Sequence, residues 1–129
     1  MIAADTSALV AVVLGEVDAE RYLASLSAEP TLISAVSLVE AGIVVEARQG
    51  VDATRDLDLL VSAAIDQVVP VDHDHATVAF NAWRQFGKGR HPAGLNLGDC
   101  FSYAVARLAR VPLLFKGDDF SRTDIAVVP

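Results

Sequence analysis

The sequence predicts an α/β fold in which a parallel sheet of about five strands lies between helices. Short apolar runs alternate along the chain with longer stretches in which apolar residues recur every three or four positions. This alternation is typical of βαβ units. With 129 residues, 53% of them hydrophobic, the chain has the size of one compact domain with a buried core. We therefore expect a single domain over residues 1–129.

The strands and helices are expected in alternation from the N-terminus. The predicted strands are Met1–Ala4, Thr31–Ile33, Val68–Val71, Leu113–Phe115 and Ile125–Val128. The predicted helices are Val17–Leu26, Ser34–Gln49, Asp52–Asp66, one that contains Ala76 to Phe86, and one that runs to Ala109. The last two helices are separated by residues 87–94, a loop with three glycines and a proline.

Three of these helices carry an apolar stripe along one face. We interpret each stripe as core rather than binding surface, because helices of a globular domain bury their apolar face. Trp83 and Phe86 are accordingly expected in the core rather than as platforms for stacked bases. The stripes are Val36, Val39, Ile43 and Ala47; Ala76, Phe80, Trp83 and Phe86; and Leu97, Phe101, Ala104 and Leu108.

Composition restricts the class of function. Ten basic and seventeen acidic residues leave a net charge of −7, the wrong sign for binding nucleic acid by charge alone. A divalent cation held by clustered acids would reverse that sign locally and receive a phosphate. The only cysteine, Cys100, forms neither an internal disulfide nor a cysteine-based zinc site. Because the chain has no secretory signal and no long apolar run, we expect a cytosolic protein without membrane attachment.

Acidic residues directly follow two of the predicted strands. Asp5 comes after the first strand, and Asp118 and Asp119 come after the fourth. In open α/β sheets, ligands bind outside the carboxyl ends of the strands, so these acids are candidate catalytic residues. Two structural alternatives stay open: Asp5 or Thr6 caps the next helix, and the Asp pair belongs to an ordinary turn.

Two further acids belong to predicted helices beside those strands. Glu40 lies in an otherwise apolar helical segment, where a carboxylate needs a partner or a metal. Ser37 and Glu40 have the spacing of a capping box, although Ser34 is an equally good cap and starts the apolar period sooner. Asp99 lies in the first turn of its helix, where negative charge is favoured, and Asn96 as a cap offers a purely structural explanation.

Taken together, these residues resemble the PIN domain and, within it, the VapC toxins of type II toxin–antitoxin pairs. The resemblance covers nearly the whole chain. Its four acidic motifs are Asp5-Thr6-Ser7-Ala8-Leu9, Ser34 through Glu40-Ala41, Leu97-Gly98-Asp99-Cys100-Phe101-Ser102-Tyr103-Ala104, and Lys116-Gly117-Asp118-Asp119-Phe120 with Thr123-Asp124-Ile125.

The resemblance implies a PIN-like three-layer sandwich with a five-stranded parallel sheet of order 3-2-1-4-5. It also implies an endoribonuclease dependent on Mg²⁺ or Mn²⁺, a homodimer, and a larger complex with a VapB-type antitoxin that inserts an Arg into the acidic cleft. The implied site residues are Asp5, Glu40, Asp99 and Asp118, with Asp119 as the substitute fourth acid and Ser7 as a hydrogen-bonding neighbour of the acids.

A mechanism follows from the oxygen ligands that hard cations prefer. One or two ions on Asp5, Asp99 and Asp118 would activate a water for attack on an RNA phosphodiester, and Glu40 would ligate through water or orient that water. The loop with Arg84, Lys88 and Arg90 leads into the Asp99 helix, so these cations are candidate RNA contacts, with a merely solvated loop as the alternative.

Other functions remain open at this stage. In a phosphorelay receiver, Asp5, Asp72 and Lys116 would be the essential residues, but that interpretation leaves Glu40 and Asp99 without a role. A dehalogenase-type phosphatase needs an Asp where Ser7 stands. A catalytically inactive RNA-binding or protein-binding PIN module is the third alternative.

Overall fold

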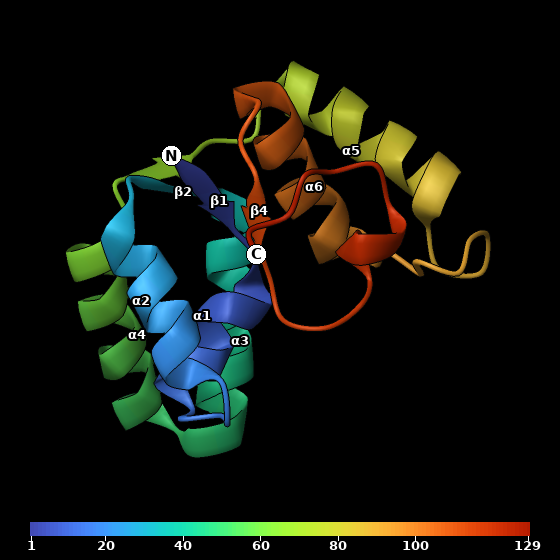
Figure 1. The fold of residues 1–129 in the computed structure, drawn as a ribbon. Coiled ribbons are helices and arrows are strands. Elements are labelled where there is room, and N and C mark those ends of the chain that lie inside the picture. Colours follow the sequence, from blue (N-terminus) through green and yellow to red (C-terminus); the bar gives the residue numbers. More distant parts are fainter.

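A four-stranded parallel sheet separates two groups of helices (Figure 1). The computed structural model describes residues 1–129, and none of its helices has the length and apolar character needed to cross a bilayer. The strands, in spatial order β3-β2-β1-β4, are β1 (Ile2–Ala4), β2 (Thr31–Ser34), β3 (Gln67–Val69) and β4 (Leu113–Leu114). The helices are α1 (Thr6–Val13), α2 (Ala19–Ala28), α3 (Ala35–Gln49), α4 (Val51–Ala64), α5 (His73–Phe86) and α6 (Leu97–Ala109), followed by the 3₁₀ turn η1 (Phe120–Arg122).

The sheet is covered on both faces, which gives the expected three layers. Successive residues of a strand point to opposite faces. Ile2 and Ala4 of β1 accordingly pack into a core with α1 to α4, and Ala3 packs into a second core with α5 and α6. Figure 1 shows these helix groups on opposite sides of the strands. The parallel, helix-flanked sheet predicted from the sequence is therefore confirmed.

The predicted fifth strand, Ile125–Val128, is wrong. This segment lies beside β4, but pairs with it only through a bridge between Leu113 and Val127. Leu113 N–H donates to Ala126 O at 2.9 Å, and Val128 N–H donates to Leu113 O at 3.0 Å. The reason is the length of β4: it has two residues, and only Leu113 directs its backbone groups away from β1. The sheet therefore has four strands in order 3-2-1-4, not five.

The three apolar stripes are only partly buried, so their interpretation as core is wrong at several positions. Exposed fractions are 62% for Val39, 65% for Ile43, 75% for Leu97, 52% for Phe80 and 40% for Trp83. Phe86, by contrast, is buried as expected. The helices bury faces of smaller residues instead, because small side chains let packed elements approach closely. These faces contain Ser37, Ala41 and Val45 of α3, and Ala79 and Ala82 of α5.

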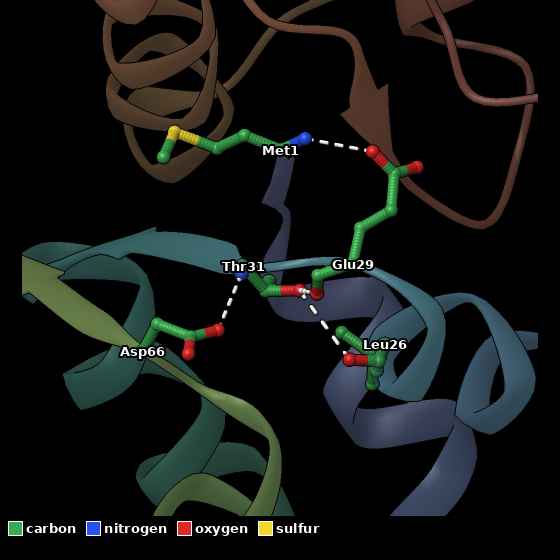
Figure 2. Close-up of polar contacts among 5 residues, drawn as sticks. All are labelled: Met1, Leu26, Glu29, Thr31 and Asp66. Atoms are coloured by element: carbon green, nitrogen blue, oxygen red, sulfur yellow. Dashed lines mark hydrogen bonds and ion pairs between the residues drawn. The ribbon is translucent and has the colours of Figure 1, made fainter.

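Polar contacts tie the chain together where β1 and β2 begin (Figure 2). Thr31 N–H donates to Asp66 Oδ2 at 2.7 Å, and the Thr31 hydroxyl donates to Glu29 O at 3.1 Å and to Leu26 O at 3.5 Å. The N-terminal ammonium of Met1 lies 2.7 Å from Glu29 Oε1. These contacts stabilise the amino ends of the strands, so the carboxyl ends are left for a functional site.

Candidate active site

Asp5 links β1 to α1 and is almost fully buried, with 4% of its surface exposed. Its Oδ2 accepts hydrogen bonds from Ser7 N–H at 3.0 Å and from Ser7 Oγ at 2.7 Å, and its Oδ1 accepts one from Ser102 Oγ at 2.5 Å. Three donors offset the cost of burying this carboxylate and fix its orientation. The helix-cap alternative is therefore correct for Asp5, and it coexists with a place at the end of β1.

Two buried serines support Asp5, Ser102 directly and Ser37 through Ser102, and neither was predicted as a site residue. Ser102 and Ser37 are 1% and 0% exposed, and their Oγ atoms lie 3.0 Å apart. A sequence signal did exist. Ser37 precedes Glu40 by three residues and Ser102 follows Asp99 by three residues, so each serine shares a helix face with an acid.

A hydrogen bond between Ser7 and Lys116 connects the segments that follow β1 and the edge strand β4 at this end of the sheet. The backbone N–H of Lys116 donates to Ser7 Oγ at 2.9 Å, and Ser7 Oγ in turn donates to Asp5. The side chain of Lys116 lies 3.4 Å from Glu16 Oε1, and both side chains are about one-third exposed. Lys116 belongs to the fourth acidic motif but was not predicted as a site residue of the PIN interpretation, and Glu16 was not expected near the acids.

Glu40 lies on α3 with its carboxylate against the start of α6. A Cβ added to Gly98 would lie 2.5 and 2.6 Å from the two carboxylate oxygens of Glu40. Only glycine therefore leaves room for Glu40 in this position. Ser34, rather than Ser37, caps α3 by accepting a hydrogen bond from Val36 N–H at 3.2 Å, so the capping-box explanation of Glu40 is wrong.

Asp99 lies in the first turn of α6 and forms a reciprocal capping box with Asn96. Asp99 N–H donates to Asn96 Oδ1 at 2.9 Å, and Asn96 N–H donates to Asp99 Oδ2 at 3.1 Å. The helix-capping explanation of Asp99 is thus correct for its Oδ2 atom. Burial and, next, the negative charge of Asp5 raise the pKa of Asp99 to about 7. A cation bound beside Asp99 would favour its charged form and lower this pKa again.

Three of the four predicted acids line one pocket of about 310 Å³ at the carboxyl end of β1. These are Asp5, Glu40 and Asp99, and the pocket also contains Ser7, Glu16, Arg48, Asn96 and Lys116. No three His, Cys, Asp or Glu side chains are placed so that together they hold a metal ion as they stand. The pocket nevertheless gathers four carboxylates from separate segments of the chain, those of Asp5, Glu16, Glu40 and Asp99.

Asp118 and Asp119 are exposed in the turn after β4 and lie outside the lining of that pocket. Of the two, Asp119 contributes to the raised pKa of Asp99, and Asp118 does not. The negative charge of Asp119 therefore acts on Asp99 more strongly than that of Asp118.

The candidate RNA contacts lie near this pocket. Arg84 is on α5, and Lys88 and Arg90 are in the loop that precedes α6; all three are exposed. Lys88 lines a second, apolar pocket, which shares Asn96 with the acidic one. Of the three cations, Lys88 therefore lines a pocket that adjoins the acidic one.

Comparison with known proteins shows to which family the chain belongs. Residues 2–126 match the model of the PIN domain. The chain belongs to the PIN-domain family. It is 51% identical over 125 residues to ribonuclease VapC30 of Mycobacterium tuberculosis, covering 96% of this chain and 95% of the relative. Such identity over nearly the whole length places it among the VapC ribonucleases of that family.

Solved structures of the family have the same fold. The sarcin-ricin-loop-cleaving toxin VapC20 of Mycobacterium tuberculosis superposes with a TM-score of 0.80 at 22% identity, covering 99% of this chain and 98% of that one. A toxin–antitoxin complex from Klebsiella pneumoniae contains a chain that superposes with a TM-score of 0.75 at 19% identity, covering 100% and 98%.

The receiver interpretation is not favoured. Asp72, its essential acid, is an exposed cap of α5 that accepts a hydrogen bond from His75 N–H at 3.0 Å. This hydrogen bond lowers the pKa of Asp72. Asp72 therefore has a structural explanation, whereas the PIN interpretation uses Glu40 and Asp99.

Proposed function

We propose that the chain is a metal-dependent endoribonuclease that acts as the toxin of a type II toxin–antitoxin pair. The observation that carries the proposal is the common pocket of Asp5, Glu40 and Asp99, in which the pKa of Asp99 is raised to about 7. Close relatives named ribonucleases support the reaction class. RNA is therefore the proposed substrate.

The donor chemistry of the pocket fits Mg²⁺ or Mn²⁺. Carboxylate oxygens are the ligands that hard cations prefer, and neither His nor Cys lines the pocket. Asp5 and Asp99 would hold the ion, with Asp118 or Asp119 as the fourth acid. When bound, the ion supplies an activated water and a positive charge for the scissile phosphate.

The protein's own residues orient the ligands and the attacking water, and one of them, Asp99, binds and releases a proton. The donors from Ser7 and Ser102 keep Asp5 in one orientation, so its free lone pairs point in a defined direction. Glu40, placed against Gly98, orients the attacking water or ligates through water. Asp99 must be ionised to bind a cation, so protons compete with the ion for this carboxylate.

Cleavage of labelled total RNA tests the proposed function. The wild-type protein should cut RNA with Mg²⁺, and EDTA or Asp99→Asn should abolish cutting. Asp58→Asn is the matched control, because Asp58 is an exposed acid on α4, outside the pocket. Full cleavage by a folded Asp99→Asn protein, or by the wild type in EDTA, would contradict the mechanism.

The proposed partners are an antitoxin and a second copy of the chain. The Klebsiella complex supports an antitoxin partner, and an inserted Arg would pair with the carboxylates in the absence of metal. The exposed Val39, Ile43 and Leu97, on neighbouring α3 and α6, support a homodimer through that face. Light scattering should give twice the 13.6 kDa chain mass for the wild type, and Ile43→Asp should give a monomer.

A further inference from the structure

Two exposed aromatic side chains stack on the outer face of α5. The ring centroids of Phe80 and Trp83 are 5.9 Å apart, with an interplanar angle of 22°. Phe80 is 52% and Trp83 is 40% exposed, although the sequence pattern predicted core positions. Clusters of large aromatic side chains that are exposed to water often mark binding sites.

Cations surround these rings. The guanidinium carbon of Arg84 lies 4.4 Å from the Phe80 ring centroid, and that of Arg90 lies 4.8 Å from the Trp83 ring centroid. Arg90 Nε also donates to the Arg84 carbonyl oxygen at 3.1 Å, which holds the loop against the helix. Arg84, Lys88 and Arg90 form no ion pair. In a protein of net charge −7, three unpaired cations on one patch favour an anionic partner.

The rings border an apolar pocket of about 440 Å³. Asn96 lines this pocket and the acidic pocket alike, so the two are neighbours. The loop fits closely under the indole: a Cβ on Gly87 would lie 2.5 Å from Trp83 Cδ1. The position of Trp83 relative to the cationic loop is therefore determined by packing.

We propose that this aromatic patch, defined as Phe80, Trp83, Arg84, Lys88 and Arg90, binds an unpaired nucleobase of the RNA substrate and its neighbouring phosphates. The inference rests on the proposed ribonuclease function. Aromatic rings and guanidinium planes stack bases, and Lys and Arg pair with phosphates. A strand bound here would pass Asn96 and place a phosphate several nucleotides away in the acidic pocket.

The charges favour RNA over two other occupants. An antitoxin segment that inserts an Arg into the acidic pocket would bring positive charge to a patch that is already positive. A second copy docked across a two-fold axis that passes through this patch would set the patch against itself. Three unpaired cations would then face three others, and like charges oppose such contact.

Trp83 is the only tryptophan, so its fluorescence reports directly on the patch. Asp99→Asn protein, which should not cut, is titrated with a short single-stranded oligoribonucleotide in Mg²⁺, and with polyphosphate as an anion without bases. The RNA should quench the fluorescence saturably, and polyphosphate should not. By anisotropy of a labelled oligonucleotide, Trp83→Ala should weaken binding about 10-fold, and Trp83→Phe should retain most of it.

Matched variants separate the patch from general charge. Arg90→Ala should weaken binding about 5-fold or more, whereas Arg21→Ala should not. Arg21 also lies over an aromatic ring, Tyr22, at 5.2 Å, but on α2, away from the patch. Circular dichroism checks that each variant is folded.

Three results would overturn the proposal: equal quenching by polyphosphate, unchanged RNA affinity of folded Trp83→Ala, or loss of dimerisation in Trp83→Ala with RNA affinity intact. Cleavage of total RNA by the wild type is measured in parallel. Cutting without quenching would reject the base site and leave the nuclease function standing. Quenching without cutting would support the base site and reject the nuclease function.

Discussion

Replacing Asp99 by Asn should stabilise the metal-free protein at pH 8. The pKa of Asp99 rises from 3.8 to about 7 in the fold, mainly because the carboxyl is partly buried and next because Asp5 is negative. One pKa unit corresponds to about 1.36 kcal/mol, so the upper limit of this effect is about 4 kcal/mol. Water still reaches the side chain, and screening reduces this figure to about 2 kcal/mol. Asn gives up about 0.3–1 kcal/mol of helix-dipole interaction at this position, which leaves a net gain of about 1–2 kcal/mol.

The sign of the pH dependence follows from linkage. Between about pH 4 and pH 7, the unfolded chain has lost the Asp99 proton and the folded chain keeps it, so wild-type stability falls as the pH rises. The advantage of the Asn variant should therefore be complete above about pH 7 and disappear as the pH falls towards 4. Below that range both states of the wild type are protonated.

Urea unfolding in EDTA, at pH 8 and again near pH 5, measures this difference. Asp58→Asn is the control, since Asp58 is exposed on α4 and should show no such gain. A folded Asp99→Asn protein that is less stable than the wild type at pH 8, or whose advantage is the same at both pH values, would contradict this prediction. Either result would show that neither burial nor Asp5 disfavours the charged carboxylate.

Three further predictions concern the same pocket. Gly98→Ala should maintain the free energy of unfolding or increase it by up to about 1 kcal/mol, because alanine favours a helix. The same variant should reduce RNA cleavage at least about 10-fold, because the new Cβ displaces Glu40. The control Gly42→Ala, which has open space around its Cβ, should leave cleavage unchanged. Ser102→Ala should cost about 1–3 kcal/mol in urea unfolding, since it removes a buried donor to Asp5, and should weaken Mg²⁺ binding, measured by calorimetry, about 10–100-fold; unchanged Mg²⁺ affinity would argue against an orienting role. Initial cleavage rates should fall as the pH decreases below about 7, and higher Mg²⁺ should move that fall to lower pH, because protons and the cation compete for Asp99.

The fold was largely predictable, because the strands and the helix order follow from local periodicity. The failures have a common physical origin. The stripes containing Val39, Phe80 and Leu97 have the right period for buried faces, but helix packing selected the faces with alanine and serine. Periodicity identifies an apolar face and does not say whether this chain or a partner covers it. The missing fifth strand likewise depends on the length of β4, which no local pattern reveals.

The acidic residues of the site were predictable from their places after strands and at helix starts. Asp5, Glu40 and Asp99 do share a pocket. Ser37 and Ser102 were not predicted as site residues. Their spacing from Glu40 and Asp99 indicates a shared helix face, but only tertiary contact shows that Ser102 reaches Asp5 and that Ser37 reaches Ser102. Spacing also does not distinguish Asp118 from Asp119 as the fourth acid, since adjacent residues in a turn point in different directions.

The hydrogen bonds around Asp5 join residues from distant parts of the chain. Ser102 is 97 positions from Asp5, and Lys116 is 109 positions from Ser7. A ribosome that has made only the first hundred or so residues has therefore made a polypeptide in which the pocket is not yet assembled. For a protein that attacks RNA, this order of synthesis is protective: the growing chain stays harmless beside the machinery that produces it, and the catalytic arrangement forms only when translation is nearly finished.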